Sequence, residues 1–237
     1  MEFFRTIYRI ARVGANKLVG REPHIPITCR IPLEFHGNDY CGWSIPKNFL
    51  AADSVIVDVG VGEDISFTQS LIARYGCRAF GFDPTPRAVS FIETLKPAGF
   101  VLHKLGLSGK SGKAQFNLPT NTQYVSGSIV NAEHLGGQKL EVELVDLTGL
   151  MDIVQASVID VLKIDIEGAE YDVLASKSFA DHARQIRAIC IEFHHRWPEF
   201  GAHRTRTAVA RLRELGFECA WGSRTTNEEF LFVRQDN

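Results

Sequence analysis

Apolar runs rich in β-branched residues alternate with segments of helical period from residue 54 onward. Continuous apolar runs are typical of parallel strands that are covered on both faces. The alternation therefore predicts an α/β fold with a doubly wound sheet. The expected strands are 55–59, 78–82, 100–105, 139–145, 158–164, 186–193, 217–221 and 229–233, the last two forming a terminal hairpin. The expected helices are 86–95, 147–154, 169–175, 207–215 and one that is capped by Asp64 or Ser66 and ended by Gly76.

The first 21 residues have a different pattern, in which apolar and basic residues alternate with helical spacing. This pattern predicts an amphipathic helix and leaves two interpretations open. The helix lies on an anionic membrane or a partner, or it packs on the domain or on a second subunit. Residues 21–47 contain four prolines and two glycines and are expected to be irregular. We therefore divide the chain into an N-terminal helix and connecting segment, 1–47, and a main domain, 48–237.

Composition narrows the class of protein. Of the 237 residues, 45% are hydrophobic and 23% are charged, which argues against disorder. A net charge of −2 disfavours a broadly basic nucleic-acid binder, so no nucleic-acid partner is expected. The five cysteines are scattered without metal or CxxC spacing and are interpreted as reduced thiols in a cytoplasmic protein. No apolar run reaches the length of a membrane span.

A glycine turn follows the first strand. Asp58, Gly60 and Gly62 stand where strand meets helix, a position at which glycines let a ligand approach the backbone. The third glycine of the dinucleotide fingerprint is missing, and Glu63 and Asp64 place negative charge where a phosphate would bind. Both features argue against NAD, although an NAD-dependent oxidoreductase stays an alternative, as does a non-catalytic cofactor-binding module.

An acidic residue follows the second strand as well. Asp83 lies a little over 20 residues beyond Gly60, and a carboxylate at that place can accept the hydroxyls of a ribose. The other interpretation is a cap for the helix that begins at Pro86. The glycine turn and the acid together favour a nucleoside ligand.

Further acids follow the two central strands. Asp165 and Glu167 come after strand 158–164, where one can approach the reacting groups and the other can cap the next helix, with Glu170 expected as a solvated acid. Glu192 and His194 end strand 186–193. Histidine suits a general base, so His194 or Asp165 is expected to take a proton. Asp165, Glu192 and His194 could also hold a divalent ion, but no motif fixes three ligands and no metal site is predicted.

Three sequence strings resemble the FkbM family of S-adenosylmethionine-dependent methyltransferases. They are VDVGVG at 57–62, FDPTP at 82–86 and LKIDIEGAE at 162–170. The resemblance covers roughly residues 43–193. It implies the Rossmann-like class I methyltransferase fold, with a seven-stranded mostly parallel sheet and an antiparallel terminal hairpin. It also implies O-methylation of a sugar, glycan or polyketide-type metabolite.

The same resemblance implies roles for individual residues. The cofactor-binding set is Asp58, Gly60, Gly62, Glu63, Asp83, Pro84, Leu107, Ser108 and Asp165. In it, the glycines contact the methionine part, Asp83 the ribose, and Leu107 and Ser108 the adenine. The catalytic set is Asp165, His194 and Glu167. Tyr40 and Trp43 could cover the cofactor or simply pack, and the polar stretch 117–131 could bind carbohydrate or be an ordinary loop. An oligomer is possible.

Overall fold

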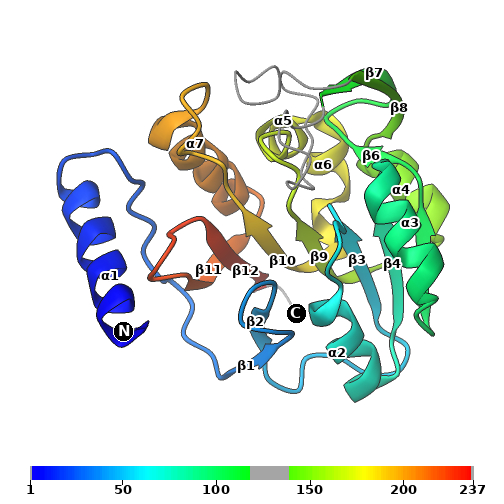
Figure 1. The fold of residues 1–237 in the computed structure, drawn as a ribbon, viewed down its shortest axis with the longest axis horizontal. Helices are drawn as coiled ribbons and strands as arrows, with labels where there is room; N and C mark the ends of the chain where they lie inside the picture. The colour runs from blue at the N-terminus through cyan, green and yellow to red at the C-terminus, as the bar shows by residue number, and fades with distance from the viewer. Residues whose placement is uncertain (1, 118–138, 236–237) are drawn as a thin grey trace.

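A seven-stranded sheet forms the centre of the computed structural model, which describes residues 2–117 and 139–235 (Figure 1). The strand order is β11-β12-β10-β9-β3-β4-β5, and β12 runs antiparallel to both of its neighbours. This confirms the predicted class I methyltransferase fold with an antiparallel terminal hairpin. The strands are β3 (Val55–Val59), β4 (Arg78–Phe82), β5 (Phe100–His103), β9 (Ile159–Ile164), β10 (Ile186–Glu192), β11 (Phe217–Gly222) and β12 (Glu229–Arg234).

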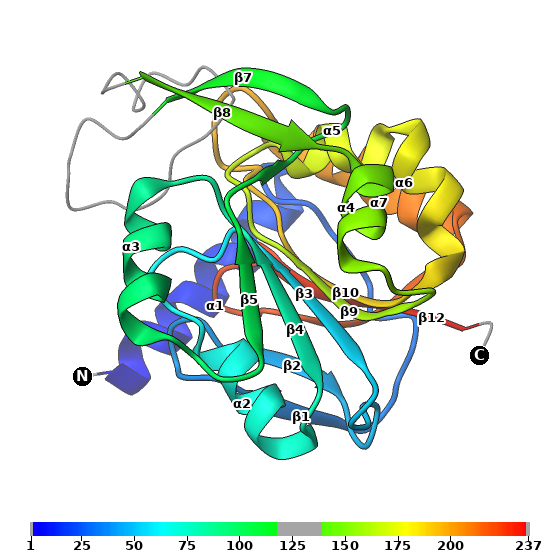
Figure 2. The ribbon, with the colours of Figure 1, turned by 90° about the vertical axis from the view of Figure 1, so that its right-hand side faces the viewer.

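Helices cover both faces of this sheet (Figure 2). On one side lie α2 (Ser66–Tyr75) and α3 (Pro86–Leu95), and on the other lie α4 (Leu147–Val154), α5 (Glu170–Ala175), α6 (Lys177–His182) and α7 (Gly201–Glu214). Alternate residues of each strand supply the two cores. Val57 belongs to the core beneath α4–α7, and its neighbour Ile56 belongs to the core beneath α2. Both faces of β3 are therefore buried, as its largely apolar sequence predicts, with Asp58 as its single polar residue.

The region before the main sheet is more ordered than expected. β1 (Leu33–His36) and β2 (Trp43–Pro46) pair as an antiparallel hairpin, so the expectation of an irregular segment over 21–47 is wrong. Earlier in the segment, the amides of Thr28 and Cys29 donate to the carbonyl oxygen of Cys219 in β11. Hydrogen bonds thus join the connecting segment to the main domain, and the boundary at residue 47 stays a prediction.

A smaller sheet lies beyond the carboxyl ends of the main strands. It contains β6 (Gly106–Leu107), β8 (Lys139–Val145) and β7 (Gly112–Asn117) in that order. The strand expected over 100–105 is β5, which ends at His103, and a further short strand, β6, follows it in the smaller sheet. The possible carbohydrate-binding residues Asn121, Tyr124 and Ser126 lie outside the described residues.

The N-terminal helix, α1 (Glu2–Leu18), stands at the left edge of the molecule in Figure 1. Its large apolar side chains Phe4, Ile7, Tyr8 and Leu18 are exposed. These four side chains of α1 therefore do not pack on the domain, although Val13 does, and packing on a second subunit or on a membrane stays a prediction. In the part of the chain that the structure describes, no helix combines the length and apolarity needed to cross a bilayer.

Candidate active site

A cavity of about 400 Å³ opens where β3, β4, β9 and β10 end, within the size range of small-molecule sites. Seven of the nine predicted cofactor-binding residues line it, as does the predicted catalytic residue Glu167. Those seven are Gly60, Gly62, Glu63, Asp83, Pro84, Leu107 and Asp165. Tyr40 and Trp43 line it too: the exposed Tyr40 favours the covering interpretation, whereas Trp43 is buried in the core beneath α2 and packs there. Glu192 and Glu229 complete an acidic wall.

Backbone geometry explains the two glycines of the turn. Gly60 and Gly62 have φ angles of 79° and 59°, in the left-handed region that glycine adopts readily. A Cβ on Gly60 would lie 1.6 Å from the carbonyl oxygen of Asp165, whereas a Cβ on Gly62 would meet nothing within 4 Å. The first glycine is therefore required because the turn passes against the end of β9. The second leaves open space beside the cavity.

Asp83 holds this turn in place. Its Oδ2 accepts a hydrogen bond from the Gly62 amide at 2.9 Å, and its Oδ1 accepts from the Thr85 amide and hydroxyl at 2.8 and 2.6 Å. The cap of α3 is Thr85, whose hydroxyl accepts from the Ala88 amide, so Asp83 is not the cap. The carboxylate is thus fixed at the cavity wall by hydrogen bonds from two loops.

Two predicted cofactor contacts do not line the cavity. Asp58 is 1% exposed and lies behind the turn, where it accepts from Lys163 Nζ at 2.9 Å and from the Thr68 hydroxyl at 2.6 Å. Lys163 also donates to the carbonyl oxygen of Gly60 at 3.1 Å. Asp58 therefore supports the turn through Lys163, because its side chain points into the sheet layer. Ser108 is also buried, and its amide pairs with Val145 of the small sheet.

Charge at the glycine turn is lower than the sequence suggests. Glu63 forms an ion pair with Arg87, and Asp64 accepts hydrogen bonds from the Asn38 side chain at 2.6 Å and from the Ser66 amide at 2.7 Å. The pair with Arg87 weakens the argument that Glu63 repels phosphate. Asp64 is bonded to the first residue of α2, while Ile65 occupies the cap position and makes no side-chain cap bond.

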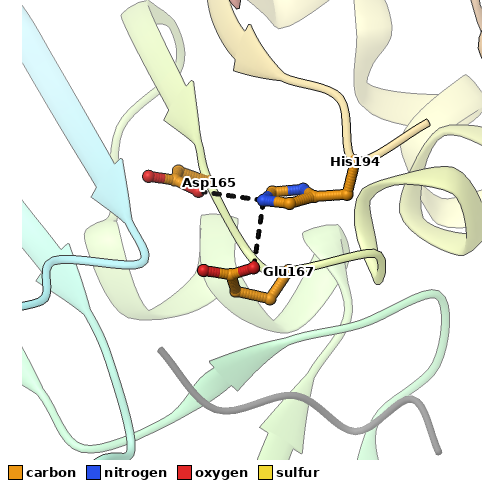
Figure 3. A group of neighbouring side chains, drawn as sticks. All are labelled: Asp165, Glu167 and His194. Carbon is orange, nitrogen blue, oxygen red and sulfur yellow. Dashed lines mark ion pairs between the residues drawn. The ribbon is translucent and has the colours of Figure 1, made fainter. Parts of the chain in front are cut away.

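The three predicted catalytic residues come together at the ends of β9 and β10 (Figure 3). The Nε2 atom of His194 lies 3.1 Å from Oε2 of Glu167 and 3.8 Å from Oδ1 of Asp165. Glu167 adopts a left-handed φ of 51°, and α5 begins without a side-chain cap, so Glu167 faces His194 and does not cap the helix. His194 is almost fully buried behind the two carboxylates, which line the cavity.

A fourth residue of this cluster is missed by the sequence argument. Glu170, expected as a solvated acid, is fully buried. Its Oε1 accepts hydrogen bonds from the His194 amide at 3.0 Å and from its Nδ1 at 3.2 Å, and its Oε2 accepts from the Gly168 amide at 2.8 Å. Glu170 therefore fixes the ring of His194 so that Nε2 points toward Asp165 and Glu167. The local sequence carries no signal for this role, because the burial of Glu170 depends on His194, 24 residues later.

Electrostatics distinguishes the members of the cluster. Burial lowers the pKa of His194, but hydrogen bonds to Glu167 and Glu170 outweigh it and raise the pKa well above its ordinary value. Burial raises the pKa of Asp165 to about 6, with Lys163 and His194 opposing the rise. Burial, reinforced by the charge of Asp165, also raises the pKa of Glu192. At neutral pH His194 is thus a cation, and Asp165 is mostly deprotonated with a pKa of about 6.

The same three residues fit a divalent ion. Among the described residues, Asp165, Glu167 and His194 each offer a ligand atom, and these atoms all lie within 4.8 Å of one another. Glu192, which the sequence argument grouped with Asp165 and His194 as possible ligands, is not part of this set. A histidine whose other nitrogen faces a carboxylate occurs in metal sites and also in proton-transfer sites.

Comparison with known proteins identifies the family. Residues 51–219 match the methyltransferase FkbM domain. The chain belongs to the FkbM methyltransferase family. Because the FkbM domain spans both the glycine turn and the acidic cluster, it decides against the NAD-dependent oxidoreductase.

Curated relatives of this FkbM protein are also methyltransferase-like. The chain is 26% identical over 192 residues to the probable methyltransferase-like protein 24 of Homo sapiens, and equally so to that of Rattus norvegicus. Each alignment covers 76% of this chain and 46% of the relative. The chain therefore spans about half the length of the curated relatives it matches.

Solved structures resemble the FkbM domain at low identity. The Methanococcus jannaschii fibrillarin pre-rRNA processing protein has a TM-score of 0.46 at 11% identity, covering 79% of this chain and 69% of that one. An rRNA methylase from Streptococcus thermophilus has a TM-score of 0.43 at 12% identity, covering 79% and 90%.

Proposed function

We propose that the chain transfers a methyl group from S-adenosylmethionine to a hydroxyl group on a sugar, glycan or polyketide-type metabolite. One observation carries this proposal: a single cavity joins a glycine turn with a fixed acid, Asp83, to a cluster of carboxylates around His194. The first half suits a nucleoside, and the second half suits a hydroxyl that must lose a proton. FkbM family membership supports the methyl transfer itself.

The donor half of the cavity fits this cofactor in shape and charge. S-adenosylmethionine supplies a methyl group on a positively charged sulfur. Gly62 leaves space beside its backbone, Asp83 presents a fixed carboxylate toward the ribose, and Leu107 offers an apolar surface for the base. Asp165, Glu167, Glu192 and Glu229 make the facing wall acidic, which favours a cationic ligand.

The acceptor half supplies the proton acceptor. The acceptor oxygen forms a bond to the methyl carbon, the carbon–sulfur bond breaks, and the hydroxyl proton passes to Asp165. A carboxylate with a pKa of about 6 is deprotonated at neutral pH and basic enough to take a proton. It is also 31% exposed at the cavity wall.

The sequence offers either His194 or Asp165 as the base, and the geometry suits His194 better to a positioning role. Its raised pKa keeps it protonated, and it lies behind the carboxylates. A protonated His194 lowers the pKa of Asp165 and holds Glu167. Glu170 in turn holds His194, so the order of contacts from core to cavity is Glu170, His194, then Asp165 and Glu167.

Two measurements test the proposal. Calorimetry with S-adenosylmethionine, S-adenosylhomocysteine and NAD should show binding of the first two and none of NAD. Transfer of a labelled methyl group to a panel of sugars, glycans and polyketides should then label hydroxyl oxygens. Binding of NAD alone would contradict the proposal that S-adenosylmethionine is the methyl donor. Labelling confined to nitrogen or carbon atoms would contradict the proposal that a hydroxyl group is the acceptor.

A chelator separates proton transfer from metal-assisted transfer. With Asp165 as the base, activity should be unchanged after EDTA treatment and removal of EDTA by gel filtration. Loss of activity that Mg²⁺ or Mn²⁺ restores would assign Asp165, Glu167 and His194 to a metal instead.

A further inference from the structure

The N-terminal helix presents its apolar side chains away from the protein. In α1, the exposed fractions are 75% for Phe4, 49% for Ile7, 68% for Tyr8 and 91% for Leu18. A helical turn takes 3.6 residues, so each residue advances the direction by about 100°. Ile7, Phe4 and Tyr8 lie roughly 20° to 80° from the direction of Leu18. These four side chains, defined here as the apolar face, therefore point to one side of the helix, with the small residues Ala11, Gly14 and Ala15 between Tyr8 and Leu18.

The contact of α1 with the rest of the chain uses a different side. Val13 is 3% exposed and lies roughly 140° around the axis from Leu18. An amphipathic helix of a globular domain normally buries its apolar stripe. Here the stripe faces outward while one valine on the far side makes the buried contact.

Directly after α1 the chain is fixed to the domain by a buried ionic cluster. Glu22 accepts hydrogen bonds from Nε2 of His195 at 2.7 Å, Nε of Arg196 at 2.9 Å and the Asn227 side chain at 3.0 Å. Burial raises the pKa of Glu22, but these partners outweigh it and lower the pKa to about 2. The helix is therefore held at its base through Glu22, which is not part of the apolar face.

Positive charge is concentrated on α1. The chain as a whole carries −2, whereas α1 contains four basic residues and one acidic residue. Arg5 and Arg12 lie roughly 120° to 140° from Leu18, at one border of the apolar face, and both are exposed, as is Arg9. Arginine can lay its apolar stem along such a surface while its charged end reaches a phosphate.

We propose that α1 docks the protein on an anionic phospholipid bilayer, with the apolar face inserted at the interface and the arginines bound to headgroup phosphates. An exposed apolar stripe bordered by cations matches that surface in both polarity and charge. A second copy of the chain matches it less well, because two such helices would bring their arginines together. The inference is independent of the methyl-transfer proposal, since it uses none of the cavity residues.

Vesicle flotation of the full chain tests the proposal. The protein should float with phosphatidylcholine vesicles that contain 30 mol% phosphatidylglycerol, and binding should fall as salt rises. Pure phosphatidylcholine vesicles should bind it far more weakly. Because a basic residue near an anionic surface contributes about fivefold in affinity, the triple variant Arg5→Glu/Arg9→Glu/Arg12→Glu should lose at least roughly a hundredfold.

Two further variants make the result specific. Ile7→Asn/Leu18→Asn removes apolar insertion without changing charge and should also abolish flotation. Lys47→Glu/Lys110→Glu/Arg206→Glu makes the same charge change at exposed positions outside α1 and should float at least ten times better than the arginine variant. Circular dichroism should show all three variants folded, because the substituted side chains are exposed.

Three outcomes would overturn the proposal. One is equal flotation with neutral and anionic vesicles, and another is no flotation with either. The third is a dimer in light scattering that Ile7→Asn/Leu18→Asn converts to a monomer while vesicle binding is absent, which would assign the apolar face to a second copy.

Discussion

The two halves of the cavity are built on opposite electrostatic principles. In the half that binds the methyl donor, both carboxylate oxygens of Asp83 accept hydrogen bonds from loop residues. Behind the glycine turn, Asp58 forms an ion pair with Lys163. In the acceptor half, several carboxylates crowd around one imidazole, and the pKa values of Asp165, Glu192 and His194 all rise. The carboxylates of the donor half are paired with hydrogen-bond donors or cations of the protein, whereas the carboxylates of the acceptor half outnumber the cations beside them.

This difference separates binding from chemistry. A carboxylate whose hydrogen bonds are already made keeps its charge and position when a ligand arrives, which suits recognition. Where carboxylates outnumber the nearby cations, their pKa values are raised toward 7, which suits proton transfer near neutral pH. Variants of the acceptor half should therefore change kcat, and variants of the donor half should change cofactor affinity or folding.

The largest effect is expected at Asp165. Asp165→Asn keeps the shape and removes the proton acceptor, so kcat should fall by about 10²- to 10⁴-fold. The control is Asp172→Asn, an exposed carboxylate on α5, which should retain wild-type kcat. Steady-state assays with a labelled acceptor measure both. If Asp165→Asn keeps wild-type kcat, the base is another residue, and Glu167 or Glu192 is the next candidate.

A matched pair of glycine variants tests how the two halves are joined. Both glycines have left-handed φ angles, which cost an alanine about 1–2 kcal/mol. Only Gly60→Ala also places a methyl against the Asp165 carbonyl, adding about 1–3 kcal/mol of overpacking. Urea denaturation should therefore show a clearly larger loss of unfolding free energy for Gly60→Ala than for Gly62→Ala. Equal losses would contradict the close contact between turn and β9.

Substitution of Asp83 should weaken cofactor binding without slowing the methyl-transfer step. Asp83→Ala should weaken S-adenosylmethionine binding by about 1.5–3 kcal/mol, since hydrogen bonds to a charged group are lost and the turn loosens. At saturating cofactor, kcat should change by less than about threefold. Glu93→Ala, at an exposed site on α3, serves as the control in calorimetry. Unchanged affinity in Asp83→Ala would show that the cofactor does not reach this acid.

The smallest effect is expected at His194, and its pH dependence is diagnostic. His194→Gln removes a cation that lowers the pKa of Asp165, so that pKa should rise above about 6. At pH 7 less Asp165 is then deprotonated, and kcat should fall by about two- to tenfold. The loss should recover as pH rises toward 8. A loss of 10²-fold or more at every pH would instead make His194 the base.

Residues whose environment is set by their own element were predictable from the sequence. Val55–Val59 is apolar except for Asp58 and is buried on both faces, and Asp165 follows β9 at the cavity as expected. Proline and glycine around Leu33–His36 and Trp43–Pro46 hid a hairpin, because its strands are only four residues long. A pairing that short depends on contacts with α2, which a local pattern does not contain.

Residues whose environment comes from another element were not predictable. Glu170 is in the first helical turn, where acids are usually solvated, and its burial depends on His194, 24 residues later. Asp58 and Glu170 are both acids near the end of a strand or helix. Asp58 supports the glycine turn through Lys163, whereas Glu170 holds the imidazole of His194. Only the register that pairs Asp58 with Lys163 tells them apart. In α1, periodicity predicted amphipathicity but not which side faces the domain.

The central claim is that Asp165 takes the proton, and the pH profile of kcat tests it most directly. Because the base must be deprotonated, wild-type kcat should be flat above about pH 7 and fall about tenfold per unit below an apparent pKa near 6. The residual activity of Asp165→Asn should lack this acidic limb. An acidic limb that persists unchanged in Asp165→Asn, or a wild-type profile that is flat down to pH 5, would contradict the account.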